Sequence, residues 1–148
     1  MLAARRWIDR WLWTLRTVAT GRASRSFTPL AGRKILLVED EPVIAIDVAH
    51  VLQKAGAHVT TSGSPQAALA LIAADGWSAV VLAPELIDGD SAPLREQLRK
   101  RNIPFVLYGV GRPDGGARHD GVWVSMSAGP AMLVRTVVEL TQGRSMSR

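Results

Sequence analysis

Residues 34–42, Lys-Ile-Leu-Leu-Val-Glu-Asp-Glu-Pro, decide the fold, because an unbroken apolar run ends there in three acids and a proline. Four consecutive apolar residues, from Ile35 to Val38, are typical of a strand buried on both faces of a parallel sheet. Pro42 suits the first position of a helix, and the apolar residues after it recur at helical spacing until Gly56. The stretch therefore predicts a strand, an acidic turn and a helix.

The rest of the chain repeats this alternation of strand and helix. Further strands are expected at residues 57–61, 79–82, 104–108 and 122–124. Further helices are expected to begin near residues 65 and 92 and to cover about 130–141. Residues 109–121 contain five glycines and a proline, so we expect a loop there and little or no helix. Alternating strands and helices predict an α/β fold with a parallel sheet and helices on both of its faces.

The first 33 residues differ from the rest in charge and in periodicity. They hold seven arginines and one acid, whereas the whole chain has a net charge of +5, so residues 34–148 are close to neutral. Residues 19–33 are rich in glycine, serine and proline without periodicity and predict a linker. Residues 4–18 predict an amphipathic helix, whose apolar stripe is Ile8, Trp11, Leu12, Leu15 and Val18. We expect an Arg/Trp-rich helical extension and linker over 1–33, one folded domain over 34–142, and a tail over 143–148.

Composition excludes several classes of function. The chain has no cysteine, which rules out a disulfide framework, thiol catalysis and thiolate metal sites. No apolar run approaches the ~20 residues that a membrane-spanning helix needs, and charged residues interrupt any signal-peptide core. We therefore expect a cytoplasmic protein. The near-neutral folded part argues against nucleic-acid binding by the domain itself.

The acids after the first strand have two interpretations when the residues are considered alone. In an open α/β sheet, ligands bind beyond the carboxyl ends of the strands. Glu39 and Asp40 lie at such an end, and adjacent carboxylates can hold Mg²⁺ through oxygen ligands. Alternatively, Asp40 or Glu41 caps the next helix and complements its dipole.

Residues 34–142 resemble the receiver domains of bacterial two-component signalling. The resemblance rests on residues 34–42, on Ser-Pro-Gln-Ala-Ala-Leu-Ala-Leu-Ile at 64–72, and on Arg-Asn-Ile-Pro-Phe-Val at 101–106. It covers about three quarters of the chain and implies a flavodoxin-like, doubly wound, five-stranded parallel sheet in a single domain. It also implies that a histidine kinase or a downstream regulator is the partner.

The resemblance further implies a phosphorylation site from which parts are missing. Phosphoryl transfer to a receiver needs a carboxylate nucleophile, a metal, a hydroxyl and a lysine. Glu39 and Asp40 match the metal-binding acids of the family. The nucleophile position falls on Ala83, the hydroxyl position on Gly109, and the lysine position within a residue or two of Ser127.

Three simultaneous losses predict a module that is not phosphorylated. A methyl group cannot accept phosphate, and the sequence has no lysine after Lys100. We therefore expect no enzymatic activity, no required cofactor, Mg²⁺ binding that is weak or lacking, and function through protein–protein contacts.

Two alternatives remain open. The first is a working receiver that uses another acid, namely Glu85, Asp88 or Asp90, although Asp88-Gly89 is typical of a turn and Asp90-Ser91 of a helix cap. The second is an adaptor in which residues 4–18 contact an anionic membrane surface. The same segment could instead pack on a partner's helix, or on a second copy of the chain in a homodimer. It could also contact nucleic acid weakly, or remain an unstructured extension.

Overall fold

The computed structural model describes residues 28–74, 76–86, 91–110 and 121–143. The described residues form a five-stranded parallel sheet in the order β2-β1-β3-β4-β5. This order is that of the flavodoxin-like doubly wound fold, so the expected fold class is confirmed. The elements are β1 (Lys34–Val38), α2 (Pro42–Lys54), β2 (His58–Ser62), α3 (Pro65–Ile72), β3 (Ala79–Leu82), α4 (Ala92–Lys100), β4 (Phe105–Gly109), β5 (Val122–Ser125), a short 3-10 helix (Met126–Ala128) and α5 (Pro130–Gly143).

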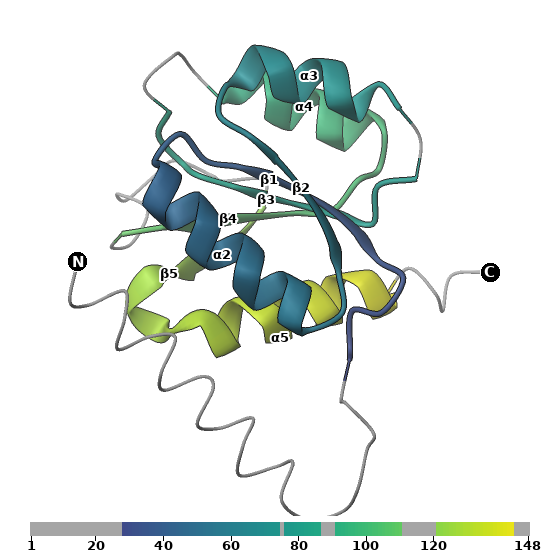
Figure 1. Ribbon diagram of the computed structural model, residues 1–148. Coiled ribbons are helices and arrows are strands. Elements are labelled where there is room, and N and C mark those ends of the chain that lie inside the picture. Colours follow the sequence, from purple (N-terminus) through teal and green to yellow (C-terminus); the bar gives the residue numbers. More distant parts are fainter. Residues whose placement is uncertain (1–27, 75, 87–90, 111–120, 144–148) are drawn as a thin grey trace, which may run out of the picture.

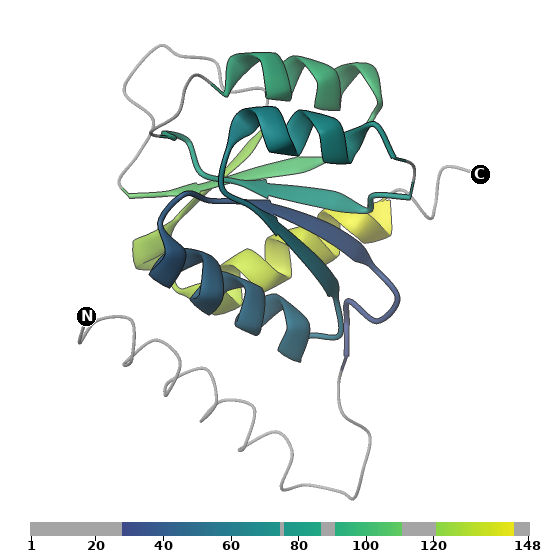
Figure 2. The same ribbon diagram turned by 45° about the horizontal axis from the view of Figure 1, so that its top comes forward.

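Helices cover both faces of the sheet (Figure 1). Helices α2 and α5 lie side by side on one face, and α3 and α4 lie side by side on the other. The view in Figure 2 separates the two layers, with α3 and α4 above the sheet and α2 and α5 below it. Right-handed crossovers explain the sides of α2, α3 and α4. The connection from β1 to β2 runs one way along the sheet, and the connections from β2 to β3 and from β3 to β4 run the other way, which places α3 and α4 on the face opposite α2.

The alternation of side chains along a strand divides the core into two clusters. In β1, Ile35 and Leu37 belong to the cluster under α2 and α5, whereas Leu36 and Val38 belong to the cluster under α3 and α4. Because successive side chains of a strand point to opposite faces, a strand covered on both sides must be apolar throughout. This is the physical reason why the unbroken run at 35–38 indicated a central strand.

Prolines and one hydroxyl set the helix starts. Pro42, Pro65 and Pro93 each lie in the first two positions of their helix, where a missing N–H costs no hydrogen bond. The Ser64 hydroxyl also accepts a hydrogen bond of 3.2 Å from the N–H of Ala67 at the start of α3. After α2, Gly56 has a φ of +101°, a conformation that an L side chain rarely adopts.

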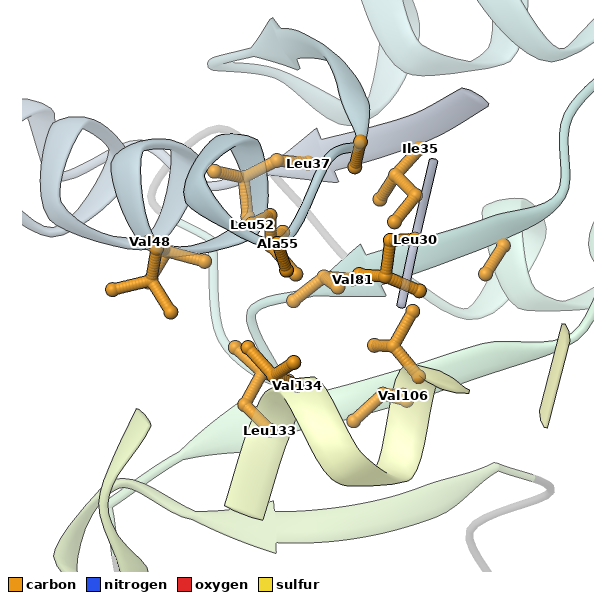
Figure 3. Close-up of a cluster of buried hydrophobic side chains, with 14 of the residues drawn as sticks. Leu30, Ile35, Leu37, Val48, Leu52, Ala55, Val81, Val106, Leu133 and Val134 are labelled. Atoms are coloured by element: carbon orange, nitrogen blue, oxygen red, sulfur yellow. The ribbon is translucent and has the colours of Figure 1, made fainter. Parts of the chain in front are cut away.

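The residues just before β1 pack onto the domain, although we expected a linker up to residue 33. Leu30 is fully buried in the α2/α5 cluster, close to Ile35, Ala55 and Val81 (Figure 3). Its N–H donates to the carbonyl of Ala55 at 2.8 Å. Periodicity could not reveal this contact, since a single leucine in a Gly/Ser/Pro-rich stretch carries no repeat.

Three expectations lie outside the described residues: the helix at 4–18, most of the loop at 109–121, and the end of the tail at 143–148. The expected strands and the remaining helices are present, with bounds that differ by one or two residues. Within the ranges that the structure describes, no helix is long and apolar enough to cross a membrane.

Candidate functional site

The carboxyl ends of β1, β3, β4 and β5 meet at one edge of the sheet. Strand β1 ends at Val38 opposite Leu82 of β3, and the N–H of Ala83 donates to the Val38 carbonyl at 2.9 Å. Strand β4 ends at Gly109 opposite Ser125 of β5. The ends of parallel strands are where ligands bind in this fold. The residues identified from the sequence are therefore brought to a single edge.

The acidic pair lies directly after β1. Glu39 is buried, and its Oε1 accepts a hydrogen bond of 2.9 Å from the N–H of Glu41. Burial raises the pKa of the Glu39 carboxyl above its ordinary value, and neighbouring Asp40 raises it further, while the Glu41 hydrogen bond opposes the rise. Glu39 thus holds the turn before α2 whether or not it binds a cation.

A methyl group occupies the position that the resemblance to receivers predicts for the nucleophile. Ala83 directly follows β3, and its side chain is buried. Glu85, two residues further on, is exposed, and Asp88 and Asp90 lie outside the described residues. In the part of the chain that the structure describes, no three His, Cys, Asp or Glu side chains are grouped so that they could hold a metal ion.

The ring of Pro84 fills the space next to Gly109, the expected hydroxyl position. A Cβ added at Gly109 would lie 2.5 Å from Cγ and 2.9 Å from Cδ of Pro84, and 3.5 Å from the Trp123 ring. Real Cβ atoms do not approach other heavy atoms as closely as 2.5 Å, and a proline ring cannot swing away as a flexible side chain can. A serine or threonine at 109 is therefore incompatible with Pro84 where it lies.

Sequence reasoning missed the role of Pro84. The contact joins residues 25 positions apart, one at the end of β4 and the other just past the end of the neighbouring strand β3, so no local sequence pattern predicts it. A signal existed only in the combination of a glycine at the end of β4 with a proline just past the end of β3. That combination becomes meaningful once the two strands are known to be adjacent.

At the end of β5 the structure places hydroxyls. Ser127 is exposed in the short 3-10 helix, and its Oγ lies 2.8 Å from the Oγ of Ser125. The half-buried Met126 between them packs against the α2/α5 cluster. None of these three side chains carries the positive charge that holds a phosphoryl oxygen in a working site.

Solved structures with the same fold are receiver domains. The receiver protein of Sinorhizobium medicae WSM419 is 23% identical, with 78% of this chain and 98% of that chain covered and a TM-score of 0.66. The receiver domain of the sensor histidine kinase PA1611 of Pseudomonas aeruginosa PAO1, which holds a magnesium ion in its active-site cleft, is 21% identical, with 76% and 99% covered and a TM-score of 0.67.

A more similar sequence is SdrG of Pseudomonas melonis Fr1, solved in its BeF3-activated conformation. It is 30% identical, with 73% of this chain and 98% of SdrG covered and a TM-score of 0.61. The sequence matches no protein-family model and no curated protein. With this identity, and with the fold that the receivers share, the chain belongs to the response regulator receiver family of two-component signalling.

Proposed function

We propose that this chain is a phosphorylation-independent receiver module that acts by binding a signalling protein, such as a histidine kinase or a downstream regulator, and has no catalytic activity. The observation that carries the proposal is the packing of Pro84 against Gly109, beside a methyl group at Ala83. The nucleophile is missing, and the place where a hydroxyl would enter is filled. The domain therefore presents one constant shape to its partner.

The acids do not fit a resident Mg²⁺ on their own. A hard divalent cation is held by several oxygen ligands, and Ala83, which follows the neighbouring strand β3, supplies no carboxylate to add to those of Glu39 and Asp40. We propose that Mg²⁺ binds weakly or not at all, and that it takes no part in function.

The direct test is incubation with acetyl phosphate and Mg²⁺, followed by intact mass measurement. We expect no phosphoryl adduct on the wild-type chain, while a receiver that carries aspartate at this position gains one under the same conditions. A phosphoryl adduct that hydroxylamine removes, as it removes an acyl phosphate but not a phosphate ester, would overturn the proposal. Peptide mapping of that adduct to Glu85, Asp88 or Asp90 would establish the alternative receiver that uses another acid.

Calorimetric titration with Mg²⁺ provides a second readout of the same proposal. We expect little heat from the wild-type chain and measurable binding by an Ala83→Asp variant, because the added carboxylate supplies the missing oxygen ligand. Ala83→Ser is the matched control, since it adds a polar atom of similar size without charge. Tight Mg²⁺ uptake by the wild-type chain would contradict the proposal.

A further inference from the structure

Helix α2 presents an apolar surface to solvent. Val43 and Ile46 are 43% and 68% exposed, and the side chains that anchor the helix to the core lie on its opposite side. Residues three apart are neighbours on a helix surface, so Val43 and Ile46 form one patch. His50 and Gln53, both exposed, continue the same face toward the end of the helix. We call the surface of these four residues the outer face of α2.

The charge around the outer face changes along the helix. Glu41 is exposed just before the first turn, and Asp47 lies one turn later. At the other end, Lys54 lies in the last turn. A ligand that carries positive charge near the start of α2 and apolar side chains along its length would therefore match this surface.

The chain leaves the described structure beside the end of α2. The Cβ of Thr28 is 2.9 Å from the place where a Cβ on Gly56 would lie, and Leu30 is tied to Ala55 by its hydrogen bond. The 27 residues that precede Thr28 are therefore attached to the domain next to the last turn of α2. Any apolar face of that segment is held at high effective concentration near the outer face.

We propose that residues 4–18 dock as an amphipathic helix on the outer face of α2 and cover it. Fifteen helical residues span about 22 Å, and the 13 residues of α2 span about 20 Å, so the lengths match. Residues 19–27 can extend about 30 Å, which is ample for a return to Thr28. The apolar stripe of residues 8–18 supplies the contact with Val43 and Ile46.

The charges select the direction in which the segment lies. Arg5, Arg6 and Arg10 are at its beginning, and only Asp9 opposes them there. If the segment runs parallel to α2, these arginines lie beside Glu41 and Asp47, and residue 18 lies near the tether. The reverse direction would place the arginines near Lys54 and would stretch the linker along the whole helix.

Docking would make the segment a built-in competitor for any partner that uses α2. A partner that needs Val43 and Ile46 must first displace residues 4–18, whether or not the domain is phosphorylated. The outer face of α2 is a different surface from the site at the strand ends, so docking there does not depend on the proposed function.

Spin labels on the full-length chain test the docking. Since the sequence has no cysteine, Ala4→Cys and Ala131→Cys introduce the only two thiols, one at the start of the segment and one exposed in the first turn of α5 beside α2. We expect one narrow distribution of distances between the spin labels at residues 4 and 131 in dilute solution without lipid. Ile46→Asp is expected to broaden it, whereas Val110→Asp, at a residue that is 84% exposed outside α2, is expected to leave it unchanged.

Three results would overturn the inference. The first is a broad distribution in the parent chain, including one that narrows only when anionic vesicles are added. The second is a narrow distribution that Ile46→Asp does not change while circular dichroism shows the variant to be folded. The third is a short distance between singly labelled chains mixed together, which would place the segment on a second copy.

Discussion

At the residue scale, the main feature of the strand-end edge is the close packing of the Pro84 ring against Gly109, which has no side chain. Gly109 has no Cβ, and the Pro84 ring lies where that atom would need space. Interiors are packed at crystal-like density, so an added atom at such a point must move its neighbours. The absence of a hydroxyl at 109 and the presence of a proline at 84 are therefore one structural feature.

Gly109→Ser is expected to destabilise the domain by about 1–3 kcal/mol, the usual cost of overpacking a dense site. Pro84→Ala should remove most of that penalty when both changes are made together. Urea unfolding of the two single variants and of the double variant gives the interaction energy directly. If the stability changes of the two single variants simply add in the double variant, then the Pro84 ring and the new side chain at 109 do not clash.

Glu39→Gln is expected to gain stability relative to wild type as the pH rises. The pKa of Glu39 is raised in the folded protein, so the folded state holds the proton more tightly than the unfolded state. The contribution of this protonation to the free energy of unfolding is complete below a pH equal to the ordinary pKa of 4.5, and it is lost as the pH rises through the pKa of Glu39 in the folded protein. Urea unfolding at pH 4, 5.5 and 7 with a chelator present measures the difference, and a constant difference would contradict the assigned cause.

At the element scale, the sequence predicted most strands and helices because burial on two faces leaves an unmistakable pattern. The unbroken runs in β1, β3 and β4 gave their strands directly, and proline positions located the helix starts. The 3-10 helix at Met126–Ala128 was not predicted, since three residues are too few for any period to show. Contacts between elements, such as Pro84 with Gly109, were beyond reach because they depend on strand register.

Ser64→Ala is expected to cost about 1 kcal/mol, because it removes the hydroxyl that accepts the Ala67 N–H at the start of α3. Ser91→Ala is the matched control: Ser91 precedes α4, but its side chain makes no capping hydrogen bond. Thermal or urea unfolding of both variants gives the comparison. If the two variants lose the same free energy of unfolding, the capping hydrogen bond at Ser64 contributes nothing to stability.

At the scale of the whole molecule, the folded unit extends beyond the sheet and its helices. Leu30 fills the α2/α5 cluster between β1, β3 and the end of α2 (Figure 3). The segment 28–33 therefore closes one end of the core, and it also fixes the point from which residues 1–27 depart. Charge and periodicity in the sequence predicted a boundary at residue 33, whereas the packing of Leu30 shows that the folded domain includes residues before β1.

Leu30→Ala is expected to cost about 2–5 kcal/mol, the range for deleting a fully buried leucine side chain. Leu30→Met, which conserves volume, should cost less than about 1.5 kcal/mol. A chain shortened to begin at Lys34 should lose at least as much stability as Leu30→Ala. Urea unfolding decides the matter, and a shortened chain as stable as the full one would show that the segment is dispensable.

The fit between Pro84 and Gly109 also limits how such a protein could change over generations. Aspartate at 83 alone would still lack the hydroxyl and the lysine, and a hydroxyl residue at 109 alone would lower stability while Pro84 remains. Neither change by itself supplies the full set of groups that phosphoryl transfer to a receiver needs. The order of changes therefore matters, because a side chain at 109 becomes tolerable only after Pro84 has been replaced.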